Sequence, residues 1–234
     1  MVTQKTRNAI LDALLALAAE RRWEAISLDD LAVRAGVSLA QLRSAYNGRL
    51  AIIADFARRT DQAVLAGIDP DMAGEPARER LFDVLFARLE ALAPNREAIR
   101  GFGKTARRDP LLAMQLNRIV AVSMSWMLTG AGISATGPGG LFRAQGLALV
   151  WARVLRTWFD DDDPGLARTM AELDRRLREG ERIILGLERL ARLIPGPFGR
   201  PRRNRQDDED QSASNPNRTN GASPRQPGVF GRGE

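Results

Sequence analysis

The chain has 234 residues, of which 44% are hydrophobic, a length that accommodates one or two domains with a substantial core. It carries 35 basic and 29 acidic residues, for a net charge of +6, and it contains neither cysteine nor histidine. These absences exclude disulfides, thiolate nucleophiles, histidine general bases and metal sites built on either residue. An all-carboxylate metal site is still compatible with this composition, but most hydrolase chemistry is not, so the composition favours a binding protein over an enzyme. We expect neither a metal nor a cofactor.

The pattern of apolar residues is helical from the first residues to about residue 194. No stretch shows the sustained period-2 alternation that is typical of strands. Carboxylates precede prolines at Glu75, Asp109 and Asp163, the pairing expected where helices begin. The sequence therefore predicts an all-α protein of about nine helices, over residues 4–21, 27–35, 38–45, 49–68, 76–92, 95–107, 110–130, 139–160 and 164–192.

Two short helices joined by a tight turn are predicted over residues 27–45. Ser27 stands three residues before Asp30, and Ser38 three residues before Gln41, so both helices begin with the spacing of a capping box. Gly36 follows the first of these helices, where a left-handed residue ends a helix. The spacing predicts a helix-turn-helix, a motif that occurs both in DNA-binding proteins and in ordinary helical hairpins.

The surroundings of this motif resemble the DNA-binding domain of TetR-family repressors. The family has an aromatic residue, then Ser or Thr, then Leu-Ala-x-x-Ala-Gly-Val-Ser, which correspond here to Trp23, Ser27 and the run over 31–38. Leu42 and Tyr46 also match. The resemblance is strong over residues 4–56. It implies a helix-turn-helix domain over residues 1–50 and a helical ligand-binding and dimerisation domain over residues 51–194.

The resemblance also implies which residues face DNA. Ser38, Gln41, Arg43, Ser44 and Tyr46 would lie at the groove, where Gln41 and Arg43 could meet either a base edge or a phosphate, and Arg49 would hold the backbone. The complete set expected at the DNA surface is Ser27, Ser38, Leu39, Gln41, Arg43, Ser44, Tyr46 and Arg49. Leu39 departs from the family, which usually has lysine there. Residues 1–50 carry seven basic and five acidic side chains, 7 − 5 = +2, a modest charge for a DNA-binding domain.

Large apolar residues over 76–160 suit either a packed core or an apolar ligand pocket between helices. The TetR resemblance favours a pocket for an unknown apolar small molecule or lipid, lined by Phe82, Phe86, Phe102, Met114, Met124, Trp126 and Met127. The arginines that could meet an anionic end of this ligand are Arg100, Arg107, Arg108 and Arg118. Asp160–Asp163 is interpreted as a helix start rather than a metal site, because no calcium-loop pattern surrounds it.

The resemblance further implies a homodimer that reads a palindromic operator in double-stranded DNA. Its seam is expected along the last helices, at Val150, Trp151, Leu155, Trp158, Phe159, Leu166, Met170, Leu173 and Leu177. The segment from Trp151 to Leu177 is also similar to a TetR-fold accessory protein of ubiquinone biosynthesis that binds lipid. Two functions therefore remain open: a ligand-responsive DNA-binding regulator, expected to be a repressor, and a lipid-binding accessory protein.

The remaining features concern location and the end of the chain. No run reaches the roughly 20 uncharged apolar residues that span a bilayer, and Asp12 and Glu20 interrupt any signal-peptide core. We therefore expect a cytoplasmic protein without stable membrane insertion. Residues 195–234 are rich in Gly, Pro, Arg, Asn and Asp and are expected to form a disordered tail.

Overall fold

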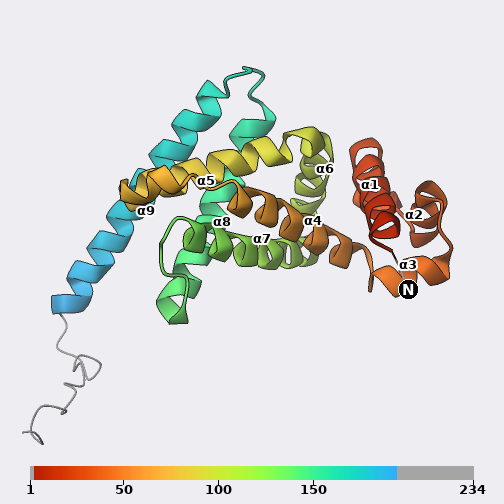
Figure 1. Cartoon of the computed structure of the whole chain (residues 1–234), viewed down its shortest axis with the longest axis horizontal. Coiled ribbons are helices and arrows are strands. Elements are labelled where there is room, and N and C mark those ends of the chain that lie inside the picture. Colours follow the sequence, from red (N-terminus) through yellow and green to blue (C-terminus); the bar gives the residue numbers. More distant parts are fainter. Residues whose placement is uncertain (1–2, 194–234) are drawn as a thin grey trace, which may run out of the picture. The chain divides into compact units, whose positions relative to one another are not determined.

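The computed structural model describes residues 3–193, and side chains as far as residue 182. Within this part the chain forms nine α-helices, three short 3₁₀ helices and no strand, which confirms the all-α prediction (Figure 1). The α-helices are α1 (Gln4–Glu20), α2 (Leu28–Ala35), α3 (Leu39–Ala45), α4 (Arg49–Ala66), α5 (Ala77–Leu92), α6 (Arg96–Ala106), α7 (Pro110–Gly130), α8 (Gly137–Phe159) and α9 (Ala167–Leu193). The 3₁₀ helices are Trp23–Ala25, Pro70–Gly74 and Ala93–Asn95. The predicted tail over 195–234 lies outside the described residues.

The helix starts show where local sequence rules hold. Asp109 caps α7 by accepting hydrogen bonds from the backbone N–H groups of Leu111 and Leu112, at 2.9 and 3.0 Å, with Pro110 in the first turn as predicted. The predicted start of α9 at residue 164 is wrong, because the helix begins at Ala167. Asp163 nevertheless accepts a hydrogen bond from the Ala167 N–H, so this carboxylate still satisfies an unpaired donor of the first turn.

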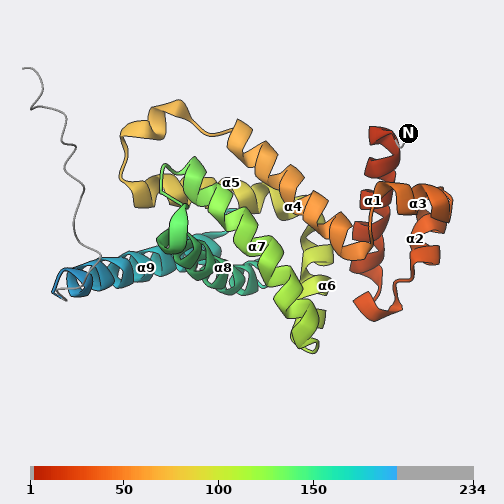
Figure 2. The ribbon, with the colours of Figure 1, turned by 90° about the horizontal axis from the view of Figure 1, so that it is seen from below.

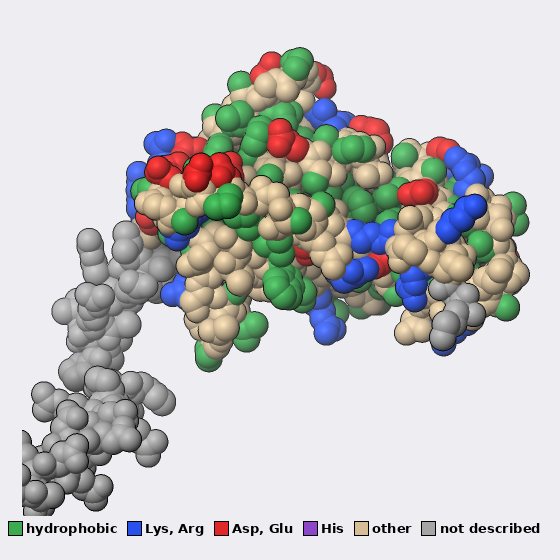
Figure 3. Space-filling view, viewed as in Figure 1, with side chains coloured by type: hydrophobic (Ala, Val, Ile, Leu, Met, Phe, Trp, Pro, Cys, Tyr) green, Lys and Arg blue, Asp and Glu red, His purple; other side chains and the backbone are tan. Residues whose placement is uncertain are grey.

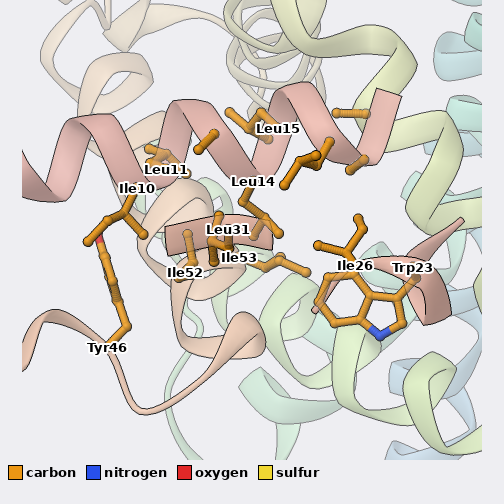
Figure 4. Packing of buried hydrophobic residues seen from close by; sticks show 14 of the residues in the cluster. Ile10, Leu11, Leu14, Leu15, Trp23, Ile26, Leu31, Tyr46, Ile52 and Ile53 are labelled. Atoms are coloured by element: carbon orange, nitrogen blue, oxygen red, sulfur yellow. The ribbon is translucent and has the colours of Figure 1, made fainter. Parts of the chain in front are cut away.

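The first three helices pack at one end of α4, which leads from them into the other helices (Figures 1 and 2). Helix α1 packs against α2, α4 and α6, while α4 packs against α5 and α7, and α7 against α8. A first hydrophobic cluster is shared by α1–α4, α6 and the start of α7; Figure 4 shows Leu14 of α1 with Leu31 and Ile52 around it. The helix-turn-helix region is therefore joined to α4, α6 and α7 by shared core packing.

A second cluster fills the space between α4, α5, α7, α8 and α9. Its fully buried members include Leu85, Met124, Met127, Trp158 and Leu173. Phe56 of α4 packs against both clusters. Among the described residues, Pro110–Gly130 is the one helix that is long and apolar enough to cross a membrane, by length and composition alone. Here it packs against α4, α5, α6 and α8 on one side, and 28% of its most apolar stretch is buried.

The connection from α8 to α9 is fixed by a buried carboxylate. Asp161 accepts hydrogen bonds from the backbone N–H and the hydroxyl of Thr169, at 2.8 and 2.6 Å. Burial alone would raise the pKa of Asp161. The hydrogen bonds from Thr169, together with a backbone hydrogen bond from Asp163 and the charge of Arg168, outweigh burial and hold the pKa below its usual value. The acidic run thus orders the first turn of α9 through Asp161 and Asp163.

Candidate nucleic-acid interface and interior cavity

The helix-turn-helix is built by two capping boxes. In α2, the Ser27 hydroxyl accepts from the Asp30 N–H while the Asp30 carboxylate accepts from the Ser27 N–H. In α3, the Ser38 hydroxyl accepts from the Gln41 N–H, and the Gln41 side-chain oxygen accepts from the Ser38 N–H at 2.9 Å. Gly36 ends α2 at φ 64°, in the left-handed region that favours glycine. These contacts fix where α2 ends and where α2 and α3 begin.

The outer face of α3 carries few charges. Leu39, Gln41, Arg43 and Ser44 are exposed, and Arg43 is the only basic residue of this helix. Its guanidinium donates to the side-chain oxygen of Asn47. Leu39 is 50% exposed, which places an apolar side chain at the tip of the motif.

Two residues expected at the DNA surface instead hold the motif in place. Tyr46 is only 7% exposed, and its hydroxyl donates to Asp55 of α4 at 2.7 Å. Arg49 donates to the backbone carbonyls of Trp23 and Ile26, and its guanidinium lies 4.2 Å from the centre of the Trp23 ring. Arg49 thus joins the start of α4 to the turn before α2. Because its guanidinium already makes these contacts, it is less available to bind a phosphate.

An apolar cavity of about 490 Å³ lies between α4, α5, α6, α7 and α8. Phe56 lines it from α4, Phe102 from α6 and Trp151 from α8. Its size falls in the range that accommodates drug-sized ligands. The polar lining side chains are Arg88, Arg107, Asn117 and Arg156.

The seven residues expected to line a pocket are placed differently. Only Phe102 lines this cavity. Phe82 and Phe86 stack against each other, with ring centres 6.5 Å apart, and Met124 and Met127 are fully buried in the second cluster. Met114 and Trp126 are exposed on the outer side of α7. A helical period identifies an apolar face but not whether that face meets a core, a cavity or solvent.

The arginines that line the cavity differ from those that the sequence predicts near a ligand. Arg107 lines it, whereas Arg100 donates to the Phe159 carbonyl at the end of α8 and ion-pairs with Glu97. Arg88 and Arg156 carry no local sequence signal, because their place at the cavity depends on how α5 and α8 cross the other helices. Of the three arginines that line the cavity, only Arg107 is among those that the sequence predicts there.

Solved structures with the same arrangement of helices belong to transcriptional regulators. A TetR transcriptional regulator from Nitrosomonas europaea aligns with a TM-score of 0.58 and 23% identity, over 75% of this chain and 97% of that one. The described part of the chain has the TetR fold. A TetR transcriptional regulator from Rhodococcus sp. RHA1 aligns with a TM-score of 0.52 and 18% identity, over 76% of this chain and 96% of that one. No family model and no curated protein sequence matches the chain.

Within this TetR fold, none of the residues expected at a dimer seam is fully exposed. All nine are buried or half-buried, and Trp151, Trp158 and Leu173 belong to the second cluster. The buried ones, Trp151, Trp158, Phe159, Leu173 and Leu177, fill the core of their own chain. Val150, Leu155, Leu166 and Met170 are half-buried, so a seam along the last helices stays a prediction at these four positions.

A different apolar surface is exposed on α7 and α8. Figure 3 shows hydrophobic side chains at the surface over α7 and the first turn of α8. Reciprocal amide hydrogen bonds of 3.1 and 3.2 Å join Asn117 of α7 to Gln145 of α8. Met114 lies one turn before Asn117, while Phe142 and Leu149 lie one turn on either side of Gln145. We define the α7–α8 face as the exposed residues Leu111, Met114, Val122, Trp126, Leu141, Phe142 and Leu149.

Proposed function

We propose that the protein is a ligand-responsive, DNA-binding transcriptional regulator of the TetR type that acts as a repressor in the cytoplasm, without catalysing a reaction. The observation that carries this proposal is the double-capped helix-turn-helix, which presents Gln41, Arg43 and Ser44 on the exposed side of α3. Arginine and glutamine are side chains that read base edges in the major groove. The TetR fold supports the same function.

The helices that line the cavity support ligand control. Helix α4 contributes Ile53 and Phe56 to the lining and follows α3 directly, while α6 contributes Phe102, whose ring meets Trp23 edge-on at 5.7 Å. Both helices thus contact the cavity and the helix-turn-helix. We infer that a ligand with different affinities for two positions of these helices changes the spacing of the recognition helices and releases DNA.

We propose that two copies associate through the α7–α8 face. Large apolar patches at a surface mark interaction sites, and a two-fold dimer presents two recognition helices to a palindrome. Trp126, on this face, is 53% exposed, and Leu141 is 71% exposed. Two antiparallel pairs of α7 and α8 would bury these side chains in a four-helix bundle.

Replacing both Val122 and Trp126 with serine is expected to weaken the dimer by at least tenfold, because tryptophans in interfaces are frequent hot spots. Analytical ultracentrifugation over a concentration series measures this change. The matched control is Val33→Ser, which removes an exposed apolar side chain from α2, outside the α7–α8 face. A wild-type chain that stays monomeric, or a dimer unchanged by the double substitution, would contradict this assignment.

The proposed function is tested by selecting bound sites from random double-stranded DNA at near-physiological salt. We expect a palindrome to be enriched, and Arg43→Ala to weaken binding to it by about 1–3 kcal/mol because one base-reading contact is lost. Fluorescence anisotropy with the selected site measures this loss. Arg153→Ala, an exposed arginine on α8, is the control and is expected to leave the affinity unchanged.

A second candidate is the lipid-binding accessory function that the C-terminal resemblance suggests. The observation that favours it is the weakly basic face of α3, where Leu39 is exposed and Arg43 is the only cation. Folded, dimeric protein that enriches no DNA sequence would exclude the regulator and support this candidate. Enrichment of a palindrome that is lost in Arg43→Ala would exclude the accessory function as the explanation of the motif.

A further inference from the structure

All the charged side chains that line the cavity are basic. Arg88, Arg107 and Arg156 line it, together with apolar side chains and the amide of Asn117, and no acidic residue among those that the structure describes is part of the lining. A cavity with apolar walls and one sign of charge concentrates ligands of the opposite sign. The lining therefore favours an anionic ligand with an apolar body.

Two of these arginines stand where the cavity opens to solvent. Arg107 follows the end of α6 and Arg156 lies in the last turn of α8; both are exposed, while all the other lining residues except Ala152 are buried or half-buried. Neither guanidinium has a hydrogen-bond or ion-pair partner among the residues that the structure describes. A ligand that reaches the opening thus meets two guanidinium groups that are not already neutralised by a carboxylate.

The interior arginine has a different role. Arg88 is 4% exposed and donates to Asp61, and this carboxylate also accepts from the Ser123 hydroxyl at 2.6 Å. The Nε of Arg88 is buried without a hydrogen-bond partner. Because Asp61 already balances its charge, Arg88 can donate to a neutral oxygen but does not require an anion. The anionic end of a ligand is therefore better placed at the opening than beside Asp61.

We propose that the cavity binds an amphipathic organic anion, with one apolar chain inside and a carboxylate at the opening between Arg107 and Arg156. This inference deepens the ligand-responsive function proposed above and rests on it for its biological role. Each methylene group transferred from water to the apolar walls contributes about fourfold in affinity. The carboxylate remains at the solvent-exposed rim, where guanidinium groups form charge-assisted hydrogen bonds to it and little desolvation is required.

Isothermal titration calorimetry of the full chain, without DNA, tests the ligand class with three probes that share a twelve-carbon chain. These are dodecanoate, dodecan-1-ol and dodecyltrimethylammonium, each below its aggregation concentration. We expect dodecanoate to bind at least tenfold more tightly than the alcohol, and the cation to bind most weakly because it meets like charges. Higher salt should weaken the binding of dodecanoate, because it screens the charge of the arginines, and should not weaken the binding of dodecan-1-ol.

Two sets of variants locate the site. Arg107→Gln combined with Arg156→Gln is expected to weaken dodecanoate about tenfold and to leave dodecan-1-ol unchanged, whereas the control Arg153→Gln, on α8 but outside the lining, should change neither. Ala152→Trp at the opening should weaken both probes by obstructing entry. Thermal unfolding checks that each variant is folded.

The outcomes separate this inference from the proposed function. Equal binding of dodecanoate and the alcohol, no binding of either probe, or unchanged affinity in the double variant would each overturn the assignment of the ligand class. None of these results depends on DNA, so DNA binding by a protein that fails this test would leave the regulator intact. Conversely, if the protein binds dodecanoate selectively but selects no DNA sequence, the anion site is supported and its role in regulation is excluded.

Discussion

Asp61→Asn is expected to lower the free energy of unfolding by about 3–5 kcal/mol, because it leaves the Arg88 charge buried without a counter-ion. Asp61 and Arg88 are 6% and 4% exposed, and they join α4 to α5. Burial lowers the pKa of Arg88, and the neighbouring Asp61 carboxylate opposes that shift. Urea-induced unfolding followed by circular dichroism measures the loss, with an unchanged slope indicating that stability alone has changed.

A double substitution distinguishes the loss of a partner from the loss of the pair. Asp61→Asn with Arg88→Met removes both charges and keeps similar side-chain volumes, so most of the stability should return. Ser123→Ala is the milder control, since it removes one hydrogen bond to Asp61 and keeps the ion pair, for an expected loss of about 1.5–3 kcal/mol. A double variant as unstable as Asp61→Asn would show that uncompensated charge is not the cause.

The sequence was most informative where structure depends on neighbours in the chain. The two capping boxes, the left-handed Gly36 and the start of α7 at Asp109 follow from residues within four positions of one another, and each is present as predicted. The helical period likewise predicted the number of helices. These rules act over one turn, so they need no knowledge of which helices meet.

Features that depend on helix crossings were not predictable in the same way. Arg49 contacts the carbonyls of Trp23 and Ile26, more than twenty residues earlier, and Arg88 meets Asp61 across 27 residues. Both arginines look like surface residues in a helical pattern. The exposure of Met114 and Trp126 is not predictable either. An apolar helical face has the same sequence pattern whether it lines a pocket or forms an exposed interaction surface.

The contact between α1 and α6 gives a second large and specific expectation. A Cβ atom at Gly101 would lie 2.4 Å from the backbone oxygen of Ala18, so alanine at this position forces the two helices apart. Alanine for glycine within a helix ordinarily stabilises by about 0.5–1 kcal/mol. We expect the clash to outweigh that gain, and Gly101→Ala to lower the free energy of unfolding by about 1–3 kcal/mol.

Gly103 offers a matched control two residues further along α6. A Cβ atom there would lie 3.7 Å from the Phe159 ring, an ordinary contact distance. Gly103→Ala should therefore gain the helical stabilisation of about 0.5–1 kcal/mol with no clash. Urea unfolding of both variants shows whether α1 and α6 are held rigidly together at Gly101 or can separate at little cost. Equal and positive shifts would mean that α1 moves away at little cost, and that α6 does not rigidly connect the cavity to the helix-turn-helix.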